Sequence, residues 1–247
     1  MAEVGVQLII YGRRVQEDLE GVFKEVSNAG YKGIEAGNLF ELRPPEEIKR
    51  ILGENSLLVA GMHSGYGDVE DEGRLMRNIG FLKEVDSRYL MCSGVGPGHG
   101  IEPYERAAET FNKVGKICRE NGIFFCYHNH NWEFAEFEGV KGIHRLCELT
   151  DPEYVKLCVD VYWVTIGGED PAEFIRRYKD RAVYFHFKDG APGSFSELGK
   201  GVVDIPRALE AALYCSPEWI VVEQDRTDKD PFISIKESRE YLKGLGL

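Results

Sequence analysis

Several features that mark common classes of protein are missing from this 247-residue chain. No run of Lys or Arg interrupts a formal net charge of −12, which argues against nucleic acid as a partner. No uninterrupted apolar stretch reaches the roughly 18–20 residues of a membrane span. The opening Met1-Ala2-Glu3 lacks the basic region that begins a signal peptide. We therefore expect a cytoplasmic protein with no nucleic-acid partner and no membrane partner.

Two cofactor or redox signatures are also missing. None of the six cysteines has CxxC spacing, and several lie in apolar runs, so we expect buried free thiols. The dinucleotide motif GxGxxG is absent. Its nearest match, GVGPGHG over residues 94–100, lacks the acidic residue about 20 positions later that would bind a ribose. A Rossmann site is therefore not expected.

The chain does contain eight apolar, strand-like segments that alternate strictly with eight helical segments. The strands are expected at 4–11, 32–36 (followed by a turn at Gly37-Asn38), 57–63, 89–93, from 123 onward, 155–163, 182–188 and 219–224. The helices are expected at 15–29, 44–54, 71–84, 104–121, 140–149, 172–179, 205–214 and 234–242. This alternation predicts an α/β fold, a single (βα)8 TIM barrel spanning 1–247 as one domain. An open doubly wound sheet is the alternative.

The stretch IFFCYHNHNWEF, residues 123–134, begins as a buried strand and ends in polar groups. If the strand continues through His130, period-two alternation places Cys126, His128 and His130 on one face. Glu133 follows within a turn. Two imidazoles and a carboxylate make a poor packing surface, so this pattern favours metal binding or proton transfer. The alternative is a pair of histidines hydrogen-bonded to the backbone.

Other ionisable residues lie at the ends of the remaining strands, where a TIM barrel builds its active site. They are Glu35, His63, Asp160, His186 with Lys188, and Glu223. Asp160 and Glu223 lie in apolar runs, and a carboxylate inside a barrel costs several kcal/mol unless it is paired or bound to metal. A mixed set of imidazole and carboxylate suits Mn²⁺, Zn²⁺, Co²⁺ or Fe²⁺. We therefore predict a bound divalent metal, and we expect Glu35 to be a solvated loop residue or a salt-bridge partner.

Five motifs in this order carry a resemblance that covers essentially the whole chain: YHNHNWEF, CVDVYW, FHFKDG, GKGVVDIPRAL and VVEQD. Together they resemble the xylose-isomerase-like TIM-barrel superfamily of sugar isomerases and epimerases. The resemblance implies one divalent metal ion, with Mn²⁺ favoured over Zn²⁺, Co²⁺, Fe²⁺ or Mg²⁺, held at the ends of strands five to eight. Carried over by position, its ligands are His128, Asp160, His186 and Glu223. Whether His128 or His130 is the ligand from strand five stays open.

The chain departs from the family pattern at two places. The sugar epimerases carry a glutamate at strand five that doubles as a catalytic base, whereas this chain resembles the branch with His128 there, in a YHNHxxEF motif. Trp163 stands where several members have a substrate-binding histidine. The first departure puts the usual proton transfer between two carboxylates in doubt.

The function implied is a metal-dependent sugar isomerase or epimerase that transfers protons through a metal-stabilised enediolate of a ketose or keto-sugar. Glu223 would serve as ligand and base, with Glu133, His130 or Lys188 as the second acid or base. His63 and Lys188 are expected to hold substrate oxygens, and Trp163 to pack on the apolar face of the sugar. The same enediolate could instead eliminate a hydroxyl, as in a lyase or dehydratase acting on a keto-sugar or keto-inositol.

Two further functions are weighed against these. A phosphodiesterase of the apurinic-endonuclease type would need a multi-metal cluster, and the histidine expected near Trp163 is missing. A non-catalytic barrel could bind a ligand without reaction. The expected partner is a small sugar, with a non-phosphorylated one slightly favoured because no basic cluster supports a phosphate site. The acidic surface and last helix leave room for a homodimer.

Overall fold

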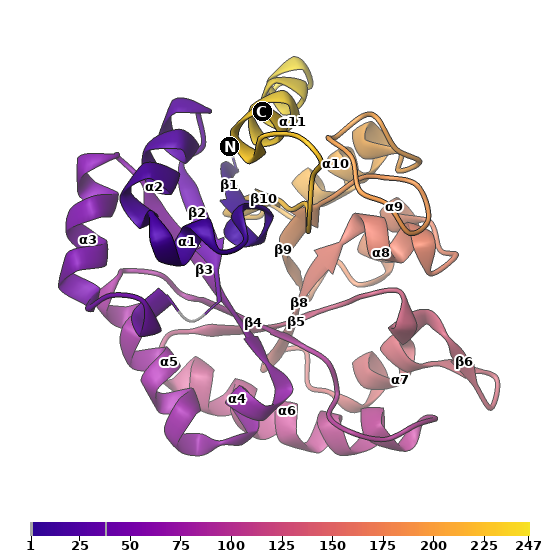
Figure 1. The fold of residues 1–247 in the computed structure, drawn as a ribbon. Coiled ribbons are helices and arrows are strands. Elements are labelled where there is room, and N and C mark those ends of the chain that lie inside the picture. Colours follow the sequence, from indigo (N-terminus) through magenta and orange to yellow (C-terminus); the bar gives the residue numbers. More distant parts are fainter. Residues whose placement is uncertain (1, 38) are drawn as a thin grey trace.

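The computed structural model describes residues 2–37 and 39–247, and a closed barrel of eight parallel strands lies at its centre (Figure 1). The strands are β1 (Glu3–Gln7), β2 (Gly33–Ala36), β3 (Leu58–Gly65), β4 (Tyr89–Ser93), β5 (Phe124–His128), β8 (Val155–Asp160), β9 (Ala182–Phe187) and β10 (Trp219–Val222). Around the barrel they follow the order β1-β10-β9-β8-β5-β4-β3-β2. The predicted (βα)8 barrel is confirmed, and the open doubly wound sheet is excluded.

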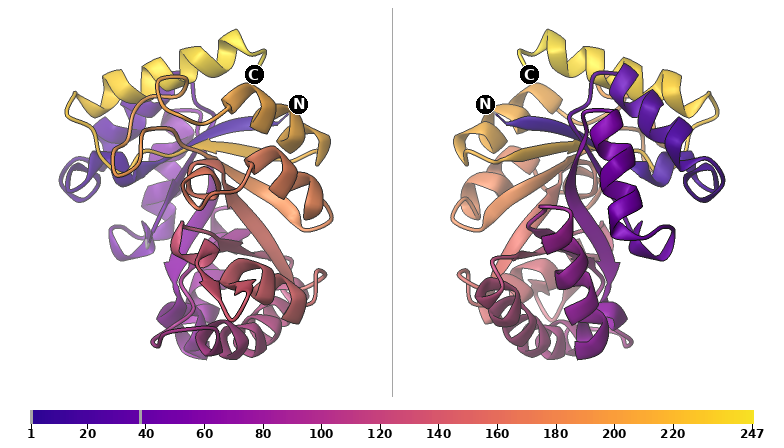
Figure 2. Two further views of the ribbon diagram at one scale, coloured as in Figure 1. Left: turned by 90° about the vertical axis from the view of Figure 1, so that its right-hand side faces the viewer. Right: turned by 90° about the vertical axis from the view of Figure 1, so that its left-hand side faces the viewer.

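Eight longer helices surround the barrel (Figure 2). They are α2 (Leu19–Asn28), α3 (Pro45–Glu54), α5 (Glu72–Glu84), α6 (Glu102–Glu120), α7 (Gly142–Leu149), α9 (Pro171–Arg177), α10 (Ile205–Tyr214) and α11 (Pro231–Gly244). Five of them begin after an aspartate whose side chain accepts a backbone N–H of the first turn: Asp18, Asp71, Asp170, Asp204 and Asp230. Such caps satisfy donors that have no partner within the helix, so they fix where each helix starts.

Short elements that were not predicted follow the carboxyl ends of several strands. They are η1 (Leu8–Tyr11), η2 (Leu39–Glu41), α4 (Tyr66–Glu70), η3 (Trp132–Phe134), α8 (Val161–Ile166) and the hairpin of β6 (Glu136–Phe137) and β7 (Val140–Lys141). A further short helix, α1 (Arg14–Glu17), is the first part of the helix expected over 15–29. The third strand, expected to end at His63, continues to Gly65 and leads directly into α4. The turn expected at Gly37-Asn38 includes residue 38, which lies outside the described residues.

Three expected elements are broken or shortened by three residues or more, and polar side chains explain each of these ends. The first strand stops at Gln7, whose side chain accepts the backbone N–H of Ile9 at 2.6 Å and starts a 3-10 turn. The helix expected over 15–29 breaks at Asp18, which caps α2. The strand expected over 155–163 stops at Asp160, because its carboxylate caps α8.

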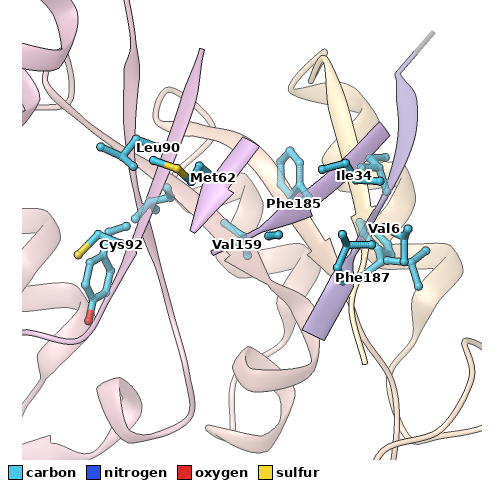
Figure 3. Close-up of a cluster of buried hydrophobic side chains, with 14 of the residues drawn as sticks. Val6, Ile34, Met62, Leu90, Cys92, Val159, Phe185 and Phe187 are labelled. Atoms are coloured by element: carbon cyan, nitrogen blue, oxygen red, sulfur yellow. The ribbon is translucent and has the colours of Figure 1, made fainter. Parts of the chain in front are cut away.

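Two apolar layers hold the strands in place. Between the barrel and the helices lie outward-facing side chains, among them the eight labelled in Figure 3: Val6, Ile34, Met62, Leu90, Cys92, Val159, Phe185 and Phe187. The inner layer consists of Ala60, Tyr89, Met91, Cys126, Cys158, Tyr184, Trp219 and Val221. All six cysteines are free and five are buried, as expected. Because alternate residues share a face, the strands that carry Cys126, Cys158 and Tyr184 place their next inward residues near the carboxyl mouth.

The ring of strands and the helix layer both close between the two ends of the chain, where α11 packs against the end of α2. β1 pairs with both β2 and β10, which completes the ring of strands. The hydroxyl of Tyr31 donates to the carbonyl of Ile235 at 2.7 Å, and Arg239 donates to the carbonyl of Gly30 at 2.9 Å, so α11 is fixed to the end of α2. No helix in the described ranges combines the length and the apolarity needed to cross a bilayer.

Candidate active site

Four ionisable side chains meet at the carboxyl ends of neighbouring strands β5, β8, β9 and β10. They are His128, Asp160, His186 and Glu223, and their nitrogen and oxygen ligand atoms all lie within 4.8 Å of one another. None of the four is more than 6% exposed. The strand register explains the convergence, since Asp160 is paired with His186 across β8 and β9. A buried set of two imidazoles and two carboxylates matches the ligands that first-row divalent metals prefer.

Each of the four side chains has one buried polar atom without a hydrogen-bond partner. These atoms are Nε2 of His128, Oδ2 of Asp160, Nδ1 of His186 and Oε2 of Glu223. The last two are also in ion-pair contact with each other. Buried polar atoms without partners are uncommon in folded proteins and call for an explanation. A single divalent ion between them would satisfy all four, so the residues present fit a metal.

The second ring nitrogen of each histidine in the cluster contacts a side chain outside the cluster. Nδ1 of His128 lies 3.1 Å from Oγ of Ser93, and Nε2 of His186 lies 2.7 Å from a carboxylate oxygen of Glu35. Partners of this kind fix the orientation of the ring and the nitrogen that faces a metal. Burial also lowers the pKa of His128 below its usual value, which favours the neutral imidazole that a metal binds.

The two carboxylates of the cluster are held in the same way. Oδ1 of Asp160 accepts the backbone N–H groups of Tyr162 and Trp163 at 2.9 and 3.0 Å. Oε1 of Glu223 accepts a hydrogen bond from Nζ of Lys188 at 2.7 Å. In each carboxylate, therefore, one oxygen accepts hydrogen bonds from the protein and the other is directed toward the centre of the cluster.

Glu35 is fully buried at the end of β2 and bridges two histidines. Besides His186, it approaches Nδ1 of His63 at 3.2 Å. Burial favours the protonated acid, but the two neighbouring imidazoles outweigh it and lower the pKa of Glu35 to about 2. The expectation of a solvated loop residue is wrong, whereas that of a salt-bridge partner is confirmed.

His63 and His130 both lie on the wall of the main cavity. Nε2 of His63 lies 2.6 Å from Oγ of Ser93, so both of its ring nitrogens have partners. His130 lies beyond the end of β5 and stacks on Trp132, with ring centroids 4.1 Å apart. Burial lowers the pKa of His130 to about 3. The geometry brings His128 into the four-residue cluster and leaves His130 beside it, which favours His128 as the ligand from β5.

Lys188 lies behind the cluster and does not line the cavity. Its ammonium contacts three carboxylates, those of Glu223, Asp225 and Asp160, at 2.7, 2.6 and 3.5 Å. It also lies 5.0 Å from the centre of the Trp163 ring. Burial would lower the pKa of Lys188, but the three carboxylates raise it above its usual value. The buried ammonium therefore keeps its proton, which does not suit the predicted role in proton transfer or substrate binding.

Glu133 is directed away from the cluster, contrary to its predicted role as a second acid or base. Its two oxygens accept hydrogen bonds from the hydroxyl of Tyr127 and from the backbone N–H of His130, each at 2.7 Å. Tyr127 belongs to the outer apolar layer between strands and helices. Burial raises the pKa of Glu133. The carboxylate holds the chain in place after β5, and closeness in sequence to His130 was misleading.

Trp163, predicted to pack on a sugar, lies on α8 and does not line the cavity. Its ring lies 5.6 Å from that of His130 and meets Phe195 edge to face at 5.9 Å. In this arrangement it supports His130 and Lys188 from behind. Contact with a substrate stays a prediction.

Two residues of the site were missed from the sequence. Ser93, the last residue of β4, contacts both His63 and His128. Asp225 lies two residues after Glu223, lines the cavity and contacts Lys188. The strand-end rule that found the histidines also applies to Ser93, and Asp225 stands within the VVEQD motif. Neither residue was distinguishable by type, since serine and aspartate are common in loops.

A cavity of about 640 Å³ opens beside the cluster. Among its lining residues, all of which lie in the described ranges, there is no Lys or Arg. Four carboxylates line it instead: those of Glu41, Asp68, Glu223 and Asp225. Its volume is in the usual range for sites that bind small molecules. The arrangement can hold a divalent ion next to a small polar molecule that carries no negative charge.

Comparisons with known proteins agree with this geometry. The family model described as xylose isomerase-like TIM barrel matches residues 23–245. An inosose dehydratase of Lacticaseibacillus casei is 26% identical over 90% of this chain and 88% of the relative. An inosose dehydratase of Mesomycoplasma hyopneumoniae is 25% identical over 98% of this chain and 96% of the relative. The crystal structure of a sugar phosphate isomerase/epimerase from Parabacteroides distasonis superposes with a TM-score of 0.83 at 21% identity, covering 98% of this chain and 94% of that one. The structural likeness shows the shared fold.

Proposed function

This chain belongs to the xylose isomerase-like TIM-barrel family, and from that premise we propose that it is a metal-dependent dehydratase of an uncharged keto-polyol. The first candidate substrate is a keto-inositol, because the relatives matched over most of their length are named inosose dehydratases. The observation that carries the proposal is the set of four unpartnered ligand atoms beside a cavity without basic side chains.

In this proposal one divalent ion, with Mn²⁺ as the first choice, is held by the four residues of the cluster. They are His128, Asp160, His186 and Glu223. Such an ion supplies Lewis-acid polarisation of a carbonyl oxygen and stabilises the charge that develops when the neighbouring carbon loses a proton. Ser93, Glu35 and Lys188 keep the ligands oriented through their hydrogen bonds.

The side chains of the cavity would carry the proton transfers. Glu223 accepts the proton from the carbon next to the carbonyl, and the electron pair left behind expels the hydroxyl from the following carbon. That hydroxyl takes up a proton and leaves as water. His130 lines the cavity and has a buried Nδ1 without a hydrogen-bond partner, so it is placed to relay this proton. Lys188 acts as a positioning residue, because its ammonium binds Oε1 of Glu223 and leaves Oε2, which contacts Nδ1 of His186, directed into the cluster.

The charge of the cavity supports an uncharged substrate. A sugar phosphate or a sugar acid would bring negative charge next to four carboxylates, and no Lys or Arg lines the described wall to bind that charge directly. Gln16, also on the wall, offers a hydrogen-bond donor and an acceptor for hydroxyl groups, whereas both ring nitrogens of His63 already have partners. The same repulsion weighs against a phosphodiesterase acting on nucleic acid.

A sugar isomerase or epimerase is the second candidate, because it shares the first proton removal. Epimerisation needs a second acid or base on the opposite face of the substrate. The family glutamate at strand five is replaced by His128, and Glu133 is bound to Tyr127 and His130. Elimination needs no group on the opposite face, so these two positions favour dehydration.

The test is a substrate screen with the Mn²⁺-loaded protein in D₂O, using a keto-inositol, several ketoses and a ketose phosphate. A dehydratase would remove one water from the keto-inositol, which mass spectrometry detects directly. Glu223→Gln should abolish the reaction, whereas Glu210→Gln, a matched change on the exposed face of α10, should leave it intact.

Each of the other possible results would point to a different function. Deuterium uptake without loss of water would establish the isomerase or epimerase. A preference for the ketose phosphate would contradict the argument from cavity charge. If the metal-loaded protein catalyses neither exchange nor elimination with any of these substrates, a barrel that binds ligands without catalysis is the better account.

A further inference from the structure

A second cavity, of about 300 Å³, lies at the opposite end of the barrel from the metal cluster. Its lining comes from the amino-terminal starts of β4, β5 and β8 and from the end of α6. Three of the lining residues are cationic, namely Arg88, Arg119 and Lys156, and one is acidic, Glu153. This balance is the reverse of the active-site cavity and unusual in a chain with a formal net charge of −12.

Lys156 is the least expected of these residues. It lies on β8 in register with Cys126 and two residues before Cys158, both of which belong to the inner layer of the barrel. Its side chain therefore faces the barrel interior, where bulky aliphatic residues normally pack. Within the described residues Lys156 has no hydrogen bond and no ion pair of 4.0 Å or less, and burial lowers its pKa. A half-buried ammonium with no carboxylate within ion-pair distance has less compensation than such groups usually have.

The two arginines stand over aromatic rings of the same cavity. The guanidinium of Arg88 lies 5.7 Å from the centre of the Phe124 ring, and that of Arg119 lies 5.7 Å from that of Tyr154. Arg88 gives two of its nitrogens to Glu218 and keeps the third without a hydrogen bond in the described residues. Arg119 is paired with Glu153 at 3.2 Å, and both side chains are more than half exposed. Ion pairs between exposed side chains contribute little stability, so these cations stay available to a ligand.

We propose that this amino-terminal cavity binds a small phosphate monoester, with its phosphate at Lys156, Arg88 and Arg119 and a planar body against Phe124 and Tyr154. Several cations around one small cavity suit a dianion better than a single carboxylate, and guanidinium groups match phosphate geometry. An adjoining hollow of about 260 Å³ shares Arg119 and Tyr154 and adds Lys116 and Glu120, so the site extends toward the outside of α6. It is separate from the proposed reaction, which takes place at the other end of the strands.

The test measures binding of phenyl phosphate by isothermal titration calorimetry at low ionic strength, with inorganic phosphate in parallel. Wild-type protein should bind phenyl phosphate saturably and more tightly than inorganic phosphate. Lys156→Met should weaken binding at least tenfold and Arg119→Gln at least threefold, whereas Lys156→Arg keeps the charge and should retain most of it. Because Arg119 is exposed, Arg119→Gln should fold, and it tests the site even if Lys156→Met does not fold.

Two controls separate this site from other anion binding. Lys24→Met removes one charge from the exposed face of α2 and should bind like wild type. Glu223→Ala disrupts the metal cluster and should also bind like wild type, so failure of the proposed dehydratase would leave this result untouched. Absence of saturable binding, equal weakening in Lys24→Met, or loss in Glu223→Ala would overturn the proposal. Equal affinity for inorganic phosphate would overturn the role given to the aromatic rings.

Discussion

The two ends of this barrel differ in how deeply their charged side chains are buried and in how they are paired. At the carboxyl end the four ionisable groups of the cluster are buried, their ligand atoms lie within 4.8 Å of one another, and each has one atom without a hydrogen-bond partner. At the amino end Arg88 and Glu218 form an ion pair at 2.6 Å with side chains 55% and 40% exposed. Exposed pairs contribute little and tolerate change, whereas buried groups without compensation are kept only where something binds them. The same strands therefore carry buried ligand atoms without hydrogen bonds at one end and largely exposed ion pairs at the other.

The largest expected contrast comes from removing one carboxylate at each end. Asp160→Asn keeps the oxygen that caps α8 but replaces the one directed into the cluster. We expect metal affinity to fall by more than the ~10–100-fold that loss of an outer partner typically costs. Glu218→Gln at the amino end should keep wild-type metal content. Elemental analysis of both variants measures this, and equal metal loss in the two would erase the contrast.

A smaller effect is expected one layer behind the ligands. Glu35→Gln removes the negative charge that orients His186 and His63 without changing the size of the side chain. Metal affinity should fall by about 10–100-fold, the usual effect of losing such a partner. Competition with a fluorescent chelator gives the dissociation constants. An unchanged constant would show that the buried carboxylate does not support the site.

The same residue predicts how the metal-free protein responds to acid. The pKa of Glu35 is lowered from 4.5 to about 2, so its ionised form stabilises the folded state above the unfolded pKa. That contribution, on the order of 3 kcal/mol, is lost as the pH falls from about 4.5 toward 2. Urea unfolding in the presence of a chelator should show a steeper loss of stability over this window for wild type than for Glu35→Gln. Parallel curves for the two proteins would contradict the prediction.

The smallest effect concerns Glu133, which lies near the reactive end but outside the cluster. Tyr127→Phe removes one of its two hydrogen bonds and should lower the free energy of unfolding by roughly 1.5–3 kcal/mol, as for other bonds to charged groups. Catalytic rate and metal content should stay within about twofold of wild type at temperatures where the variant is folded. A tenfold loss of rate in the folded variant would restore Glu133 to the reactive end.

The sequence was most informative where one physical rule decides the structure. Buried strands are apolar, and all eight barrel strands were found for that reason. Their ends were less certain, because Val161–Ile166 is as apolar as the strand before it and only the cap by Asp160 turns it into a helix. Leu8–Tyr11 was likewise taken for strand, although the side chain of Gln7 starts a 3-10 turn there.

The same limit applies to the candidate site. Strand ends placed His128, Asp160, His186 and Glu223 near one another without any coordinates, because parallel strands bring their carboxyl ends to one mouth. Distances in sequence do not show direction, so Glu133 was assigned to the cavity although Tyr127 holds it on the outer side. The sequence also could not show that Lys188 lies behind three carboxylates, since its partners come from other strands.

The pairing of β1 with β10 has a consequence for how the protein is made. During synthesis β1 leaves the ribosome before the other strands of the barrel, and its second neighbour, residues 219–222, is made more than 200 residues later. Until then one edge of β1 has no partner from β10, and exposed edges of this kind favour pairing with other chains. Ligand residues from β5, β8 and β9 are made earlier, yet Glu223 completes the set only when that gap closes. Metal uptake should therefore be a late event that reports closure of the ring.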